Sequence, residues 1–291
     1  MTPSPASHAP SPPFVALDEE TALTPIDFQR LTGANEVRRA LAAFRPKQVA
    51  VEAPAEIAAE FLAAIHTLPR VALVAWREAG GAQARYLAAD PCDGRVEALR
   101  AAMDFRLPVL FLDTTAFEPQ TPLPAPDANA VDVLGTEAIF DQWRLARADA
   151  APSARSRAMT RRLKKSIRKA GEHARTLVVT AYSTACDMAA LWQEDLSGEQ
   201  PVLGRVESVV SVPVEGRLLP FALFEAPYFA HLYEVFRGGE GAATPFPLEE
   251  AVAALFRESE EIYRDEYDEA VSRTEWRALT QYARNLALLE G

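Results

Sequence analysis

Short apolar runs alternate with amphipathic helical patterns through most of the first two thirds of the chain, and this alternation constrains the fold most strongly. Between the runs, apolar residues recur at helical spacing, as at Val37, Leu41 and Phe44. Strands that alternate with helices form a mostly parallel sheet with right-handed crossovers. The sequence therefore predicts an α/β protein whose mostly parallel core sheet is flanked by helices. The predicted strands are residues 24–28, 47–51, 71–76, 109–112 and 176–181.

A different pattern begins after residue 192. Two β-prone stretches, 206–214 and 218–224, are separated by Glu215 and Gly216 and predict an antiparallel β-hairpin. Two helices are expected to follow, an acidic one over 248–268 and one over 272–289 that opens with a capping-box pattern. We expect three parts: a disordered proline-rich lead (1–20), an α/β core (21–192), and a hairpin plus helical cap packed on the core (193–291).

Composition narrows the class of protein. Hydrophobic residues make up 49% of the chain and charged residues 24%, as in ordinary globular proteins. No apolar run approaches the roughly 18 residues of a membrane span, and the proline-rich start lacks the basic and apolar regions of a secretory signal. Cys92 and Cys186 lack metal-ligand spacing, which favours reduced thiols in a cytoplasmic protein. The net charge of −11 argues against a surface that binds nucleic acid or anionic membrane throughout.

Polar residues at the C-terminal ends of the predicted strands form the candidate site, because parallel sheets bind ligands at that edge. Glu52 and Asp113 would face each other there if their strands are neighbours. One interpretation is a carboxylate pair that holds Mg²⁺ or Ca²⁺. The other, which helix-cap preferences favour, is two caps paired with Arg155 or Arg30. Thr184 ends a polar loop after the last strand, but a nucleophilic hydroxyl needs an adjacent base, and none is evident.

Five short motifs in this part of the chain resemble those of one family. The first three, with the family motif second, are Arg30–Asn35 at the place of a His-His-Ser-Pro-Ala-Cys turn, Val51-Glu52-Ala53-Pro54 at that of Ile-Glu-Gly-Pro, and Leu110 to Asp113 at that of an apolar strand ending in Asp. The last two are Arg155 to Met159 at the place of Arg-Glu-x-x-Met, and Ala181 to Thr184 at that of Gly-x-x-His. Residues 24–192 thereby resemble the TraB/ChaN/Tiki-like α/β superfamily, which includes erythromycin-esterase-like proteins. Within it, they resemble an uncharacterised bacterial family encoded beside MoxR-type AAA ATPases and von Willebrand factor A proteins.

The departures from the family motifs bear directly on function. Arg30 and Leu31 replace a histidine pair, Ser156 replaces a glutamate, and Thr184 replaces a histidine. In superfamily members that act as metal-dependent hydrolases, such residues hold the metal or move the proton. Transition metals require imidazole or thiolate ligands, and a neutral-pH general base is most often histidine.

The resemblance, with these losses, implies a catalytically degenerate protein without a cofactor. It would act as an adaptor or regulatory component of a bacterial multi-protein system, with a MoxR-type AAA ATPase or a von Willebrand A protein as partner. The alternative is a hydrolase of a small ester or phosphate with an oxygen-ligated divalent cation. Its metal ligands would be Glu52 and Asp113, and its catalytic candidates would be Glu52, Asp113, Arg155 and Thr184.

A basic helix is predicted over residues 155–169, with eight Lys or Arg residues and no acid. Met159, Leu163 and Ile167 form its narrow apolar stripe, so the charges cover the remaining surface. A nucleic-acid site usually adds stacking aromatics, which this segment lacks. The sequence leaves three interpretations of these cations open. They bind a protein partner, they face solvent, or they pair with the acidic helix of the same or another chain. The partner-binding candidates are Arg161, Arg162, Lys164, Lys165, Arg168 and Lys169.

Overall fold

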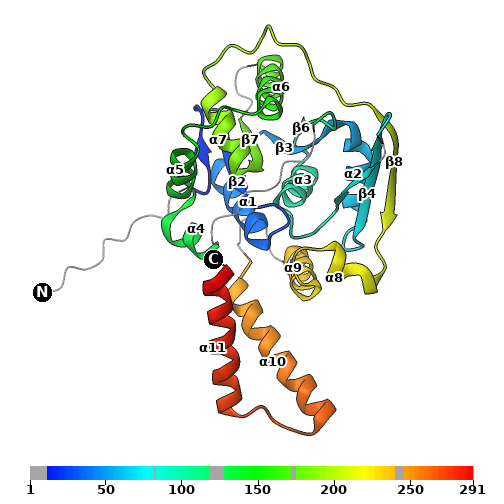
Figure 1. Ribbon diagram of the computed structural model, residues 1–291, viewed down its shortest axis with the longest axis vertical. Helices are drawn as coiled ribbons and strands as arrows, with labels where there is room; N and C mark the ends of the chain where they lie inside the picture. The colour runs from blue at the N-terminus through cyan, green and yellow to red at the C-terminus, as the bar shows by residue number, and fades with distance from the viewer. Residues whose placement is uncertain (1–11, 82, 118–127, 172–174, 240–245, 291) are drawn as a thin grey trace, which may run out of the picture. The chain divides into compact units, whose positions relative to one another are not determined.

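The computed structural model describes residues 12–81, 83–117, 128–171, 175–239 and 246–290 (Figure 1). The chain forms two compact units, Met1–Pro245 and Phe246–Gly291. The boundary predicted at residue 192 lies inside the first unit. None of the helices in the described ranges combines the length and hydropathy that a membrane span requires.

A five-stranded sheet forms the centre of the first unit. Its strands β2, β7, β3 and β6 run parallel, and the short β1 joins β2 in the antiparallel direction. This arrangement confirms the predicted α/β class and the mostly parallel sheet. In spatial order the strands are β1 (Val15–Ala16), β2 (Thr21–Ile26), β7 (Thr176–Ala181), β3 (Gln48–Pro54) and β6 (Val109–Asp113).

Helices cover both faces of this sheet because successive strand side chains point to opposite faces. In β7, Leu177 and Val179 join the core beneath α1 (Leu31–Phe44) and α3 (Gly94–Phe105), whereas Val178 joins the opposite core. The opposite face carries α5 (Thr136–Ala146), α6 (Ala154–Ala170) and α7 (Tyr182–Leu191). Figure 1 shows α6 beside β7 and β6, away from α1 and α3.

A second, antiparallel sheet of three strands lies in the same unit, in the order β5-β4-β8. Its members are β5 (Ala84–Ala88), β4 (Ala72–Glu78) and β8 (Val206–Pro213), and α2 (Ala58–His66) packs against it after a 3-10 turn, η1 (Ala55–Ile57). The prediction that 71–76 is a strand of the parallel core is therefore wrong. Buried and half-buried residues alternate along most of β4, as expected of a strand covered mainly on one face.

The predicted hairpin of 206–214 with 218–224 is also wrong. β8 pairs with β4, more than a hundred residues earlier, instead of with the following segment. That segment forms the 3-10 turn η2 (Gly216–Leu218) and the short helix α8 (Leu219–Ala222). Pro220 fits the first turn of a helix because that turn does not use the missing backbone N–H.

Two predicted loops contain helix. Tyr182 to Thr184 form the first turn of α7, which begins directly after β7. The proline-rich composition of residues 118–132 predicts a loop. This stretch lies partly outside the described residues, and its end belongs to α4 (Ala128–Leu134). Of the lead predicted to be disordered, residues 1–11 lie outside the described part, and the remainder includes β1.

Helix α9 (Pro227–Gly239) is attached to α1 and α3 by buried ion pairs. Arg100 forms a two-bonded pair with Glu234, with one N···O distance of 3.0 Å. Glu97 accepts from Arg38 at 3.4 Å and from Arg237 at 2.9 Å. Because Arg38 and Glu97 are each 1% exposed, this network fixes α9 in place with little screening by water.

The second unit is a helical hairpin of α10 (Leu248–Tyr267) and α11 (Arg273–Glu290). Phe256 and Trp276 join the two helices with their rings edge to face, 5.7 Å apart. The backbone N–H of Ser272 donates to Glu275 Oε2 at 2.7 Å, and Glu275 N donates back to Ser272 Oγ at 3.2 Å. The predicted capping box is thus confirmed.

Candidate functional site

Four candidate residues meet at the C-terminal edge of the parallel sheet. Glu52 lies in β3 and Asp113 ends the neighbouring β6, while Arg155 and Thr184 lie in the first turns of α6 and α7. Arg155 donates to Asp113 Oδ1 from Nε at 3.0 Å and to Oδ2 from Nη2 at 2.6 Å. The same Nη2 lies 3.2 Å from Glu52 Oε1, to which Thr184 Oγ1 donates at 3.2 Å. The structure therefore groups these four residues into one buried cluster.

The remaining side-chain contacts of Glu52 come from the end of β7, where the chain enters α7. Its Oε2 accepts from Thr180 Oγ1 and, at 2.9 Å, from the backbone N–H of Ala181, the N-cap of that helix. A carboxylate is stabilised at this end of a helix because the helix dipole is positive there. With 2% exposure and partners on both oxygens, Glu52 is held in place by its surroundings.

Arg155 occupies the position between the two carboxylates. Burial alone lowers the pKa of Arg155, but its hydrogen bond to Asp113 and the charges of Glu52 and Asp113 outweigh burial and raise that pKa. The guanidinium supplies the positive charge that a divalent cation would supply between two carboxylates. Of the two interpretations open from the sequence, pairing with Arg155 is the one whose contacts are present.

Arg162 fixes the end of the strand that carries Asp113. Its Nη1 donates to the backbone oxygens of Phe111 at 3.3 Å, Leu112 at 3.2 Å and Asp113 at 2.5 Å. Charge-assisted bonds of this kind satisfy carbonyls that the edge strand β6 leaves open. Arg162, a partner-binding candidate from the sequence, is therefore engaged inside its own fold.

Glu56, just after β3, organises a neighbouring junction that the sequence analysis missed. Its carboxylate accepts from Thr114 Oγ1, from Thr115 N at 3.1 Å and from Gly204 N at 2.8 Å. Burial raises the pKa of Glu56, but these hydrogen bonds outweigh burial and lower it. Gly204 is required because a Cβ there would lie 1.9 Å from Thr115 Oγ1. The junction ties the segment before β8 to the end of β6.

Asp90 is the most perturbed carboxyl outside the cluster, and the sequence analysis also missed it. Burial, together with the negative charges of Asp93 and Glu225, raises its pKa to about 7, although backbone N–H groups of Cys92 and Phe224 oppose the rise. Its Oδ2 has no hydrogen-bond partner among the described residues. A perturbed carboxyl can mark an active site, but Asp90 is 0% exposed, so no substrate reaches it in this structure.

Metal and thiol chemistry find little support in the described residues. No three His, Cys, Asp or Glu side chains in these ranges are placed to hold a metal ion. Burial raises the pKa of Cys186 to about 11 and that of Cys92 well above its usual range, so both thiols are protonated at neutral pH. Burial also raises the pKa of Tyr182, so its phenol stays protonated at neutral pH.

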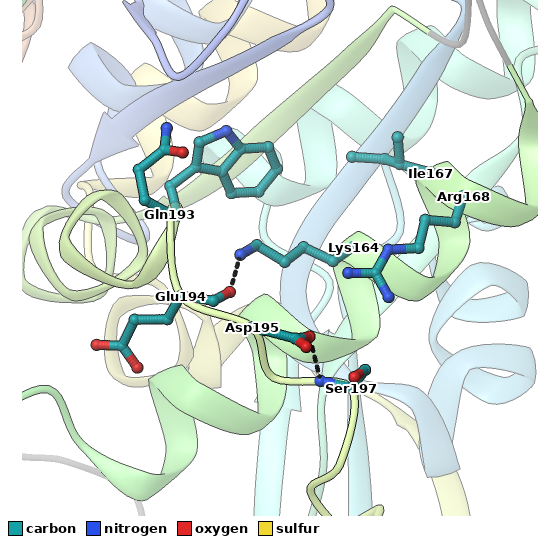
Figure 2. A pocket seen from close by; sticks show the side chains of 8 residues that line it. Lys164, Ile167, Arg168, Gln193, Glu194, Asp195 and Ser197 are labelled. Atoms are coloured by element: carbon teal, nitrogen blue, oxygen red, sulfur yellow. Dashed lines mark hydrogen bonds between the residues drawn. The ribbon is translucent and has the colours of Figure 1, made fainter.

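Two cavities lie along α6, on the helix that carries the predicted partner-binding cations. The larger, about 520 Å³, lies against the segment after α7; its lining residues are Lys164, Ile167, Arg168, Trp192, Gln193, Glu194, Asp195 and Ser197. The smaller, about 190 Å³, shares three of these; it is lined by Arg161, Lys164, Lys165, Arg168, Leu196 and Ser197. Figure 2 shows Lys164 and Arg168 projecting from α6 toward this segment.

The cations of α6 divide into fixed and available ones. Lys164 Nζ donates to the backbone oxygens of Leu191 at 3.1 Å and Glu194 at 2.7 Å (Figure 2). In the described part of the chain, four other cations form neither a hydrogen bond nor an ion pair: Arg161, Lys165, Arg168 and Lys169. Of the six partner-binding candidates from the sequence, these four remain available to a partner, whereas Arg162 and Lys164 are bonded within the fold.

Comparisons with protein-family models, with characterised proteins and with solved structures found no match. The resemblance to the TraB/ChaN/Tiki-like superfamily therefore stays a prediction, and function has to be argued from the residues themselves.

Proposed function

We propose that the protein is a catalytically degenerate TraB/ChaN/Tiki-like protein that acts as an adaptor or regulatory component of a bacterial multi-protein system. The observation that carries the proposal is the position of Arg155, bonded to Asp113 and paired with Glu52 at the edge where hydrolases of that superfamily keep their metal. A guanidinium held there by two carboxylates opposes a second cation at the same place.

Two exposed surfaces support a binding role. The available cations of α6 offer positive charge to an acidic partner surface. On the other sheet, Val210 and Val212 of the edge strand β8 are 53% and 51% exposed, and Phe221 of the following α8 is 85% exposed. Val210 and Val212 lie on the same face of the strand, and exposed apolar groups on an edge strand can mark an interaction site. The partner implied by the resemblance is a MoxR-type AAA ATPase or a von Willebrand A protein.

The competing function is a hydrolase of a small ester or phosphate that uses an oxygen-ligated divalent cation. The convergence of Glu52, Asp113 and Thr184 favours it, because carboxylate oxygens are the ligands that Mg²⁺ and Ca²⁺ take. For this function Arg155 would have to leave Asp113 when the ion binds. Ion binding therefore separates the two functions.

Metal analysis of the purified protein, paired with thermal unfolding in Mn²⁺, Zn²⁺, Mg²⁺ and Ca²⁺, tests the proposal. We expect no stoichiometric ion and no stabilisation. An ion present at about 100 times its Kd would add about 2.7 kcal/mol, which raises the Tm of a domain of this size by roughly 5–10 °C. Such a shift, absent from Asp113→Asn, would overturn the proposal in favour of the hydrolase.

The adaptor role is tested separately with a purified MoxR-type AAA ATPase from the same organism. We expect binding that weakens when Lys165 and Lys169 are both replaced by Glu, because attraction across charged surfaces depends on these cations. Replacement of Arg217 and Arg277, which lie on other helical segments, by Glu serves as a charge-matched control. Binding that responds equally to both pairs of substitutions would reflect net charge alone and would contradict the assignment of α6.

A further inference from the structure

We propose that the two cavities along α6 form one binding site for a small nucleotide. The phosphate would lie among Arg161, Lys165 and Arg168, and the nucleoside would lie beside Ile167 and Trp192. The inference goes beyond the proposed function, since it requires neither an adaptor role nor a closed cluster at the strand ends.

The phosphate end follows from four cations on one helical face. Lys164 and Lys165 each lie three or four residues from both Arg161 and Arg168, so each lysine side chain neighbours both arginines on the helix surface. Like charges at this spacing repel one another, and no carboxylate lines the smaller cavity that they surround. Burial and, next, the nearby charge of Arg168 lower the pKa of Lys164, while the charges of Asp195 and Glu194 oppose this shift. A phosphate would offset this repulsion and accept charge-assisted hydrogen bonds from the two arginines.

Lys164 gives this end a fixed geometry. Its ammonium is bonded to the backbone of Leu191 and Glu194, and it lies 5.3 Å from the centre of the Trp192 ring. It therefore contributes charge from a set position, while Lys165 and Arg168 remain able to close on an anion. Trp192 is itself oriented by a 3.1 Å hydrogen bond from Nε1 to Asp18 Oδ2.

The nucleoside end follows from the mixed lining of the larger cavity. Its volume of about 520 Å³ falls in the range of roughly 300–1,000 Å³ typical of small-molecule sites. Ile167 and Trp192 offer apolar surface to a planar base. Asp195 keeps one carboxylate oxygen on the backbone N–H of Ser197 at 3.0 Å, and this bond helps to lower its pKa. The side chain of Ser197 also hydrogen-bonds this carboxylate, which keeps lone pairs that can accept from a ribose hydroxyl or an amino group.

The second acid in the larger cavity does not oppose an anion there. Glu194 is bonded to Arg157 at 2.8 Å, and Figure 2 shows its carboxylate directed away from the Lys164 ammonium. A nucleic-acid polymer fits the site less well than a mononucleotide. The net charge of −11 repels a long polyanion, and residues 155–169 provide no row of stacking aromatics.

Calorimetric titration of the full chain at low salt tests the site with AMP, GMP and UMP, with inorganic phosphate, and with adenosine. We expect at least one nucleotide to bind more tightly than phosphate, and adenosine to bind most weakly. Lys165→Gln and Arg168→Gln should each weaken nucleotide binding about ten-fold, the loss of one charge-assisted hydrogen bond. The control is Lys169→Gln, an exposed cation of the same helix that lines neither cavity, and it should change affinity less than about two-fold. All three side chains are exposed and make no bond to the rest of the described protein, so folding is not at risk.

Asp195→Asn separates the two ends of the site. It should strengthen the binding of phosphate, because a negative charge is removed, and reduce the preference for nucleotide over phosphate. Failure of all three nucleotides to bind at millimolar concentration would overturn the proposal, as would an equal loss in Lys169→Gln. Tighter binding of an oligonucleotide or of polyglutamate than of any mononucleotide would also overturn it, and the polyglutamate result would leave the proposed acidic protein partner intact.

Discussion

Replacing Arg155 with methionine tests the central interpretation of the strand-end cluster. Methionine keeps a long side chain but removes the charge and all donors. Asp113, 4% exposed, would lose its bonds at 3.0 and 2.6 Å, and Glu52, 2% exposed, would lose its ion pair. Glu52 would keep its three other hydrogen-bond donors.

The expected loss of unfolding free energy in Arg155→Met follows from these lost and retained bonds. Removing one partner of a buried ion pair costs about 3–5 kcal/mol, because the other charge is left buried without compensation. The retained donors of Glu52 place the loss near the lower end, about 3 kcal/mol, with Asp113 as its main source. For a domain of this size, that lowers Tm by roughly 6–12 °C.

Urea unfolding followed by circular dichroism measures the loss at neutral pH. The matched control is Arg157→Met, two residues further along α6, where the arginine pairs with Glu194 and Glu199 at the surface and its removal should change stability little. Adding Asp113→Asn to Arg155→Met should recover part of the loss, since the uncompensated charge is then gone.

Equal losses in Arg155→Met and Arg157→Met would refute the reasoning. So would a loss in Arg155→Met that does not respond to Asp113→Asn. Either result would mean that the cluster does not depend on the guanidinium charge, and that the site could accept another cation.

Two further predictions concern the residues that the sequence analysis missed. Asp90→Asn should stabilise the protein at about pH 8 and much less at about pH 5. In the native protein the pKa of Asp90 is raised from 3.8 to about 7, so between these values the folded state holds a proton that the unfolded chain releases. The free energy of unfolding of the unsubstituted protein therefore falls by up to about 4 kcal/mol as pH rises through that window. Urea unfolding at both pH values measures this, and the same difference at both would contradict it. Gly204→Ala should destabilise by about 1–3 kcal/mol through overpacking, because the new Cβ would lie 1.9 Å from Thr115 Oγ1. Gly198→Ala, where a Cβ would meet nothing within 4 Å, is the thermal-unfolding control, and equal effects would contradict the clash.

The parts of the fold that the sequence predicted are those encoded locally. The basic helix and the strand after it matched α6 and β7 closely, because charge pattern, apolar stripe and β-branched run all lie within the segment. The run 71–76 shows the limit. Its apolar residues predicted a strand correctly, but the sheet to which a strand belongs depends on its partners. For β4 the second partner is β8, which lies more than a hundred residues away.

The same distinction applies to the candidate site. Glu52 and Asp113 could be brought together from the sequence because both end strands of one parallel sheet, whose carboxyl ends share an edge. Asp90 could not be identified, since an Asp before a proline is typical of a turn. Its surroundings include the backbone of Phe224 and the charge of Glu225, contributed by a segment that follows much later in the chain. Glu56 was missed for the same reason, because Gly204 reaches it from the segment before β8.

Arg155 lies between Glu52 and Asp113, where a divalent ion would lie if the two carboxylates were metal ligands. Two buried carboxylates on neighbouring strands repel each other unless positive charge lies between them. Either a divalent ion or Arg155 can supply that charge, but not both, because the guanidinium already lies 2.6 Å from Asp113 and 3.2 Å from Glu52. The stability contributed by Arg155 and the absence of a bound ion are therefore one hypothesis. A large loss in Arg155→Met with no ion in the native protein would support the degenerate site on both counts. An ion in the native protein would require Arg155 to move, and would favour the competing function, a metal-dependent hydrolase.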